Sequence, residues 1–153
     1  MRKVEAFQLA LGRFVLEWSG MEFSLDLLVL ASWKLQTPKR AKPPHNLSGK
    51  LDAIREVARG EKLASFALAI DGIAREIEAM ADERHDYIHG ASVQMFEAER
   101  PFSVSLGRLL QPRNRPRRRP VKVTAADLNK AANRARSIGD RTLDLAESVN
   151  KLN

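Results

Sequence analysis

Cysteine is absent from this chain of 153 residues, and its absence excludes several classes of site. The chain has no disulfide, no thiolate nucleophile and no cysteine-ligated zinc, and this composition suits a reducing compartment. Long apolar runs are missing as well, since none approaches the ~20 residues that a membrane-spanning helix requires. The acidic Glu5 also interrupts the first residues before an apolar leader segment begins. We therefore expect a soluble cytoplasmic protein with no membrane partner.

Glycine-rich phosphate loops and internal repeats are also lacking, and the composition is that of an ordinary globular protein. Hydrophobic residues make up 44% of the chain and charged residues 29%. A chain of this length buries one sizeable core and is short for two. We predict a single domain over residues 1–153.

The net charge of +7 is concentrated in one proline-marked segment. Between Gln111 and Val123 there are six basic residues and no acidic one, so the rest of the chain is nearly neutral. The pattern predicts an exposed loop that binds the nucleic-acid backbone, and the alternative is a solvated hairpin tip without a partner. The candidate binding residues are Arg113, Arg115, Arg117, Arg118 and Arg119.

Apolar residues spaced three and four apart predict four helices. The first covers residues 4–35, and the second begins at a Ser48 cap and ends at Gly60. The third runs from Glu61 to Gly90, and the last follows a cap formed by Thr124 and Asp127. The apolar stripe of the first helix wraps most of its surface, so we expect more than one partner surface to cover it. The residues that widen this stripe are Val15, Phe23, Leu27, Leu30 and Trp33.

Residues 91–123 break the helical period. Alternation with a period of two in residues 92–97 and 102–106 predicts a β-hairpin, and residues 120–123 read as a third short strand. The sequence therefore predicts an all-α fold, an up-and-down four-helix bundle with a small β-hairpin inserted before the last helix.

Titratable residues gather at the end of the third helix, where residues 82–90 read DERHDYIHG. Arg84 continues the apolar stripe, whereas His85 and His89 lie together on its flank. A guanidinium binds phosphate oxygens and an imidazole transfers protons near neutral pH, so this set favours cleavage of RNA, whose 2′-hydroxyl is an internal nucleophile. Arg84 and His89 are about 140° apart around the helix, which favours a site completed by a second chain.

The segment from Arg84 to His89 resembles the Arg-x4-6-His motif of HEPN domains, and residues 20–25 are similar to the first helix of that family. The resemblance implies a helical bundle that forms a homodimer with facing motifs. It also implies metal-independent endoribonuclease activity without a cofactor, in a toxin or defence system where a cognate antitoxin is a further partner. Some toxins of the family carry a tyrosine two residues after the histidine, where this chain has Ala91.

Carried over by position, the resemblance implies a role for each residue of the motif. Arg84 would stabilise the phosphate and His89 would act as the acid or base. His85 or Asp86 would orient that histidine.

Three other interpretations of the same residues stay open. Arg84 can be a structural cation paired with a carboxylate, for which the candidates are Glu22, Asp26 and Asp86. A HEPN-like module can bind protein or RNA without cleaving. His85 and His89 can also form a metal pair of a hydrolase, with a third ligand from Asp82, Asp86 or Glu22.

Overall fold

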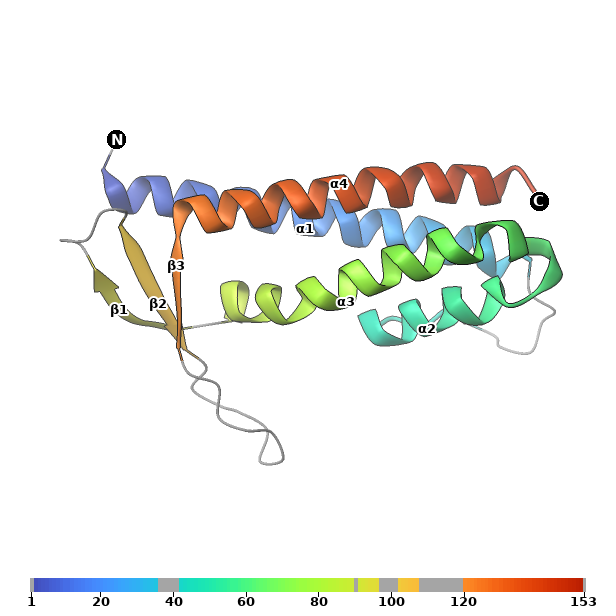
Figure 1. The fold of residues 1–153 in the computed structure, drawn as a ribbon, viewed down its shortest axis with the longest axis horizontal. Helices are drawn as coiled ribbons and strands as arrows, with labels where there is room; N and C mark the ends of the chain where they lie inside the picture. Colours follow the sequence, from blue (N-terminus) through green and yellow to red (C-terminus); the bar gives the residue numbers. More distant parts are fainter. Residues whose placement is uncertain (1, 36–41, 90, 97–101, 108–119, 153) are drawn as a thin grey trace, which may run out of the picture. The chain divides into compact units, whose positions relative to one another are not determined.

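Four α-helices and three short β-strands make up the part of the chain that the computed structural model describes, residues 2–35, 42–89, 91–96, 102–107 and 120–152 (Figure 1). The elements are α1 (Lys3–Trp33), α2 (Leu47–Ala58), the 3-10 helix η1 (Glu61–Phe66), α3 (Ala67–His89), β1 (Ala91–Phe96), β2 (Ser103–Gly107), β3 (Val121–Thr124) and α4 (Ala125–Asn150). A mostly helical fold with a small antiparallel sheet before the last helix is confirmed. None of the helices described is both long and apolar enough to span a membrane.

The chain divides into two compact units. Unit 1 comprises residues 1–18 and 79–135, and unit 2 comprises residues 19–78 and 136–153. The three long helices α1, α3 and α4 each contribute a segment to both units.

The core of unit 1 forms where the sheet meets the first turns of α1 and α4. The strands are antiparallel in the order β1-β2-β3, with Met95 opposite Val104 and Val104 opposite Val123. Because side chains alternate between the two faces of a strand, every second residue of β2 and β3 points toward the helices. The buried cluster contains Phe7, Ala10, Phe102, Val104, Leu106, Val123 and Leu128.

A capping box starts α4 at the end of β3, as the sequence predicted. Asp127 Oδ2 accepts hydrogen bonds from the backbone N–H of Thr124 at 2.9 Å and from its hydroxyl at 2.7 Å. The backbone N–H of Asp127 donates in return to Thr124 Oγ1 at 3.2 Å. Reciprocal capping satisfies amide groups that the first helical turn leaves without partners, and it fixes where strand changes to helix.

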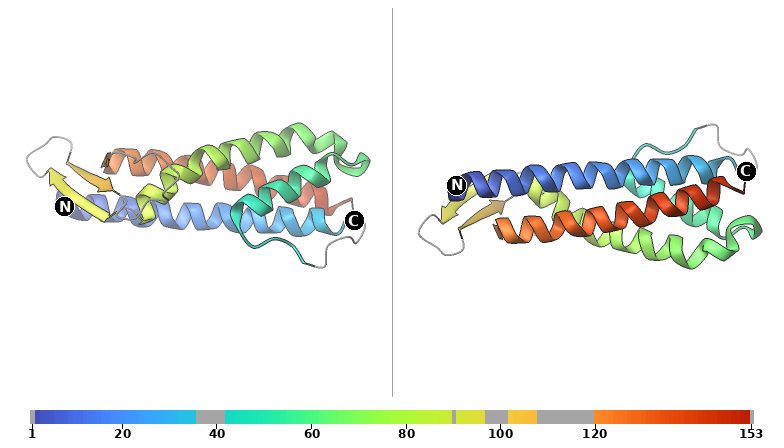
Figure 2. Two further views of the ribbon diagram at one scale, coloured as in Figure 1. Left: turned by 90° about the horizontal axis from the view of Figure 1, so that it is seen from below. Right: turned by 90° about the horizontal axis from the view of Figure 1, so that it is seen from above.

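Unit 2 is entirely helical in its described residues, and small residues let its helices pack closely. A Cβ added at Gly139 of α4 would lie 3.2 Å from Met21 Cα of α1, so this glycine permits the close approach of the two backbones. Thr142 is fully buried, and its hydroxyl donates to the carbonyl oxygen of Ile138 at 2.7 Å. Figure 2 shows α2 and the first turns of α3 running side by side as a helical hairpin.

Two predicted helix starts are wrong. The second helix begins at Leu47 rather than after Ser48, because the side chain of Asn46 accepts from the backbone N–H of Gly49 at 2.7 Å and is the cap. Residues 61–66 form the 3-10 helix η1, and the α-helix begins only at Ala67. A 3-10 turn at the N-terminus of an α-helix is a common tightening of the backbone, and here it buries Leu63 completely.

Candidate functional site

Arg84 lies in unit 1, and it packs against an aromatic ring. Its side chain is half-buried, with Nε inaccessible to solvent, and Cζ lies 5.8 Å from the ring centroid of Trp18. Trp18 is only 1% exposed, so the ring is a fixed part of the core. A cation over an indole face is attracted by the ring quadrupole, and this contact restricts the guanidinium to few orientations.

A second aromatic contact fixes the next turn of α3. The rings of Tyr87 and Phe14 meet edge to face with centroids 5.2 Å apart, and Phe14 also contacts Trp18 at 6.3 Å. Burial raises the pKa of Tyr87 above its ordinary value, and the nearby carboxylates of Glu83 and Asp127 add to this effect. The Tyr87 hydroxyl is therefore a neutral hydrogen-bonding group near pH 7.

A polar pocket of about 340 Å³ opens beside this segment of α3. Its walls come from α3, β3 and α4, and they carry three basic and two acidic side chains. The lining residues are Glu83, Tyr87, Lys122, Val123, Asp127, Lys130, Ala131 and Arg134.

Two contacts hold charged groups of this pocket in place. Arg134 Nη1 lies 3.2 Å from Glu83 Oε1, and Asp127 is held by its capping bonds to Thr124, which lower the pKa of its carboxyl group. The pocket carries more cationic than anionic groups, which suits an anionic ligand such as a phosphate.

The other predicted site residues of α3 point in different directions from Arg84, because consecutive residues are about 100° apart around a helix. His85 is exposed and Asp86 is buried. His89 is the last residue of α3, and its side chain lies outside the described part of the structure. The structure shows Arg84 against Trp18, and the pairing of Arg84 with His89 stays a prediction.

The basic segment also lies outside the described residues, and with it the five predicted nucleic-acid contacts: Arg113, Arg115, Arg117, Arg118 and Arg119. In the sequence these arginines directly precede Pro120, where the chain enters β3 and the wall of the polar pocket.

A metal site receives no support from the side chains that the structure describes, since no three of the His, Asp and Glu residues among them gather closely enough to hold an ion. One of the proposed carboxylate partners of Arg84 has another contact, because Asp26 accepts from Lys50 Nζ at 2.5 Å within unit 2.

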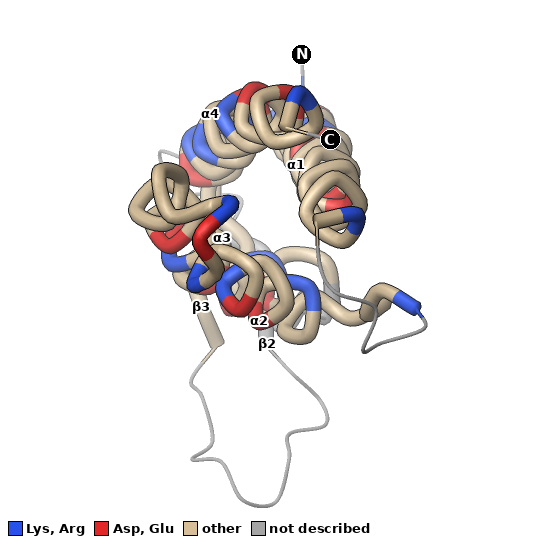
Figure 3. Tube along the Cα trace, turned by 90° about the vertical axis from the view of Figure 1, so that its right-hand side faces the viewer, with Lys and Arg blue, Asp and Glu red and all other residues tan. Residues whose placement is uncertain are grey.

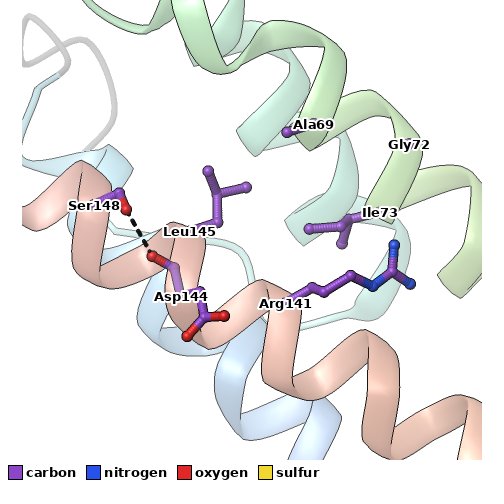
Figure 4. A pocket seen from close by; sticks show the side chains of 7 residues that line it. All are labelled: Ala69, Gly72, Ile73, Arg141, Asp144, Leu145 and Ser148. Atoms are coloured by element: carbon purple, nitrogen blue, oxygen red, sulfur yellow. Dashed lines mark hydrogen bonds between the residues drawn. The ribbon is translucent and has the colours of Figure 1, made fainter.

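Unit 2 contains a different kind of depression, a shallow groove of about 430 Å³ between α3 and α4. Ala69, Gly72 and Ile73 form one wall, and Leu145 forms part of the other (Figure 4). The hydroxyl of Ser148 donates to the carbonyl oxygen of Asp144 at 2.9 Å, and Arg141 forms two hydrogen bonds with Glu76, at 2.7 and 2.9 Å. The guanidinium of Arg141 and the hydroxyl of Ser148 thus already have partners, and we assign no chemistry to this groove.

Comparison with protein-family models, with curated proteins and with solved structures finds no match for this chain. The function of this chain is therefore inferred from the residues described above.

The sequence interpretation missed two parts of the site. Trp18 received no role from the sequence, because its contact with Arg84 depends on the alignment of α1 with α3. The polar pocket was missed because Glu83 and Tyr87 on α3 and Asp127, Lys130 and Arg134 on α4 are far apart in the sequence. Their spacing of three and four along each helix was a usable signal for a charged face, but it does not reveal which helices adjoin.

Proposed function

We propose that this chain is a HEPN-like, metal-independent endoribonuclease whose site lies at the end of α3. The observation that carries the proposal is Arg84, a half-buried arginine stacked on Trp18 beside a pocket rich in cations. A guanidinium whose orientation is already restricted loses little entropy when it binds a phosphate. The motif resemblance adds His89 five residues further on.

The proposed reaction is attack of an RNA 2′-hydroxyl on the adjacent phosphorus. One histidine removes the proton of the 2′-hydroxyl as the new O–P bond forms, and a second histidine protonates the departing 5′-oxygen as the P–O5′ bond breaks. His89 of two subunits, or His89 and His85, would divide these roles. Arg84 stabilises the negative charge on the phosphate oxygens in the transition state. The products are a 2′,3′-cyclic phosphate and a 5′-hydroxyl.

The second part of the proposal concerns Lys122, Lys130 and Arg134, which line the polar pocket and would bind neighbouring phosphates of the RNA. The five arginines of the basic segment would add affinity that does not depend on sequence and falls with salt. A toxin or defence role, with a cognate antitoxin as partner, follows from the resemblance alone.

The test is RNA cleavage by purified protein in the presence of a chelator. We expect cleavage with cyclic phosphate ends, and a loss of about 100-fold or more in Arg84→Ala and His89→Ala. Arg84→Lys should recover little activity because it keeps the charge but not the planar fork. Arg75→Ala, on the exposed side of the same helix, and His45→Ala are matched controls that should retain full activity.

A non-catalytic module is the second candidate, and the packing of Arg84 on Trp18 favours it, because a stacked arginine also stabilises a fold that has no activity. RNA binding without turnover by the wild type would support this module. Cleavage that survives in folded Arg84→Ala and His89→Ala would overturn the assigned site.

A further inference from the structure

Arg13 of α1 is held by two asparagines of α4, and all three residues belong to unit 1. Its Nη1 donates to Asn129 Oδ1 at 3.2 Å, and its Nη2 donates to Asn133 Oδ1 at 2.5 Å. The two asparagines are four residues apart, so they are neighbours on one face of α4. Arg13 and Asn133 are exposed to solvent, and Asn129 is partly exposed. Two hydrogen bonds thus fix this guanidinium at the surface, and we call the three residues the Arg13 cluster.

The partners of Arg13 carry no charge, unlike those of several other arginines. Arg75, Arg134 and Arg141 each form an ion pair with a carboxylate. The described part of the chain shows no carboxylate in an ion pair with Arg13, although Glu17 lies one turn further along α1. Hydrogen bonds to a carboxylate are shorter and stronger than those to an amide, so a carboxylate would anchor a purely structural arginine better. The two amides orient the guanidinium and leave its positive charge in place.

The chemistry of the guanidinium determines how both amides are turned. A guanidinium only donates hydrogen bonds, so each asparagine directs its carbonyl oxygen toward Arg13 and its NH2 group away from it. The cluster therefore presents two amide NH2 groups beside the remaining N–H groups of a cation. A nucleobase edge offers both donors and acceptors, whereas the oxygens of a phosphate or a carboxylate only accept. A surface composed of donors and one positive charge fits such an anion.

The Arg13 cluster is next to the polar pocket along α4. Lys130 and Arg134, which line the pocket, directly follow the two asparagines in the sequence. Consecutive residues are about 100° apart around a helix about 10 Å wide, so the two sites lie on neighbouring sides of α4, on the order of 10 Å apart. Asp127 is the one acidic residue between positions 125 and 135, and its carboxylate caps the helix. Basic residues recur along α4, as its blue bands in Figure 3 show.

We propose that the Arg13 cluster binds a phosphate of the RNA backbone, close in the strand to the phosphates bound by the polar pocket. The strand would cross the outer side of α4 from the pocket to Arg13. The choice of RNA as the anion rests on the proposed function, whereas the cluster itself contains no residue of the motif from Arg84 to His89. Because the contact is to a phosphate, it adds affinity without sequence preference.

Binding of a fluorescent single-stranded RNA that carries 2′-O-methyl groups tests the proposal. This RNA keeps every phosphate but has no 2′-hydroxyl to attack, so binding by the full chain is measured without cleavage. Fluorescence anisotropy at several salt concentrations gives the affinity and its salt dependence. We expect Arg13→Gln to weaken binding by about 10-fold, as loss of a hydrogen-bonded charge does. The slope of log affinity against log salt should fall by about 0.7, the contribution of one phosphate of a single strand.

Asn133→Asp separates a role in binding from a role in folding. The new carboxylate has nearly the shape of the amide and accepts the same hydrogen bond from Arg13, so the variant should be at least as stable as the wild type. It cancels the positive charge of the cluster, so RNA binding should weaken as much as in Arg13→Gln. Asn150→Asp is the matched control, because Asn150 accepts a hydrogen bond from Lys34 at 3.4 Å in unit 2. It places the same charge beside another cation and should bind RNA as the wild type does.

Four results would overturn the proposal. The first is a wild type that does not bind the RNA, and the second is unchanged affinity in folded Arg13→Gln and Asn133→Asp. The third is an equal loss in Asn150→Asp, which would show that only the total charge of the chain matters. The fourth is binding of polyglutamate as tightly as RNA, lost in the same variants, which would assign the cluster to an acidic protein.

Cleavage of ordinary RNA, measured in parallel, separates this inference from the ribonuclease activity. Binding that depends on Arg13 without turnover would support the cluster and overturn the ribonuclease activity alone. Turnover with an RNA affinity that does not depend on Arg13 would overturn the cluster and leave the ribonuclease activity supported.

Discussion

Arg55 and Arg141 in unit 2 contact carboxylates, whereas Arg84 in unit 1 packs against an aromatic ring. In unit 2, the half-buried Arg55 and the exposed Arg141 form ion pairs, with Arg55 Nη1 2.6 Å from Glu78 and Arg141 Nη2 2.7 Å from Glu76. In unit 1, Arg84 is half-buried over the ring of Trp18. A carboxylate orients a guanidinium through charge and hydrogen bonds, whereas an indole face orients it through the quadrupole of the ring. The orientation of Arg84 therefore depends in part on the buried ring of Trp18, whereas Arg55 and Arg141 depend on neighbouring carboxylates.

The largest expected effect comes from removing the ring on which Arg84 lies. Trp18→Ala should lower the free energy of unfolding by about 3–5 kcal/mol, since it deletes a fully buried aromatic side chain. Trp18→Phe should lower it less, because an aromatic face remains for the guanidinium. Chemical denaturation followed by circular dichroism measures both. Equal losses in the two variants would show that the ring retained in Trp18→Phe contributes nothing to stability at this position.

Removal of the capping box in unit 1 should have an intermediate effect on the free energy of unfolding. Thr124→Ala should lower the free energy of unfolding by about 1 kcal/mol. The hydrogen bonds from Thr124 lower the pKa of Asp127. The Asp127 carboxylate therefore stabilises the fold fully above the ordinary aspartate pKa, and this stabilisation is lost as the pH falls through the lowered value.

Acid titration of Asp127→Asn checks this direction. The variant should lose less stability than the wild type as the pH falls below about 4. Asp140→Asn, at an exposed position of α4 in unit 2, is the control for the loss of one carboxylate charge. Identical acid profiles for wild type and Asp127→Asn would contradict the assignment.

The ion pair of Arg55 with Glu78 should have a small effect. Glu78 is about half exposed, so solvent screens the pair, and a double-mutant cycle of Arg55→Ala and Glu78→Gln should give a coupling of about 0.2–1 kcal/mol. The coupling should shrink at high salt. A coupling energy that is large and independent of salt would show that solvent does not screen the ion pair of Arg55 with Glu78.

Of these changes, Tyr87→Phe should alter the free energy of unfolding least near neutral pH. In alkali it should alter how stability depends on pH. Burial raises its pKa above the ordinary value of about 10, so the folded state retains the phenolic proton longer than the unfolded state. This contribution to stability is complete below the ordinary pKa and is lost as the pH rises through the raised value.

Ultraviolet titration measures the pKa of the Tyr87 hydroxyl directly, because Tyr87 is the single tyrosine of the chain. The phenolate signal should appear at higher pH in the native protein than in the denatured one. Tyr87→Phe should remove the signal and reduce the alkaline loss of stability. A native pKa at or below the denatured one would show that the Tyr87 hydroxyl is solvated.

The sequence alone predicted the helical periodicity, the strands, the Thr124–Asp127 cap and the position of Arg84 on the apolar stripe of its helix. These features depend on residues a few positions apart, and local geometry determines them. The cap of α2 was missed because Ser48 and Asn46 are both good capping residues, and the choice depends on the backbone conformation before the helix.

Only the tertiary structure decided which side chains from distant segments meet. The sequence placed Arg84 among apolar positions, but it could not select Trp18, 66 residues earlier, as the ring beneath it. The sequence set Phe23 apart only as a residue that widens the apolar stripe of α1, and packing decided that Phe14 and Trp18 are buried while Leu16 and Phe23 stay open. The reason is that periodicity fixes the direction of a side chain around its own helix, whereas contacts depend on which elements pack against that helix.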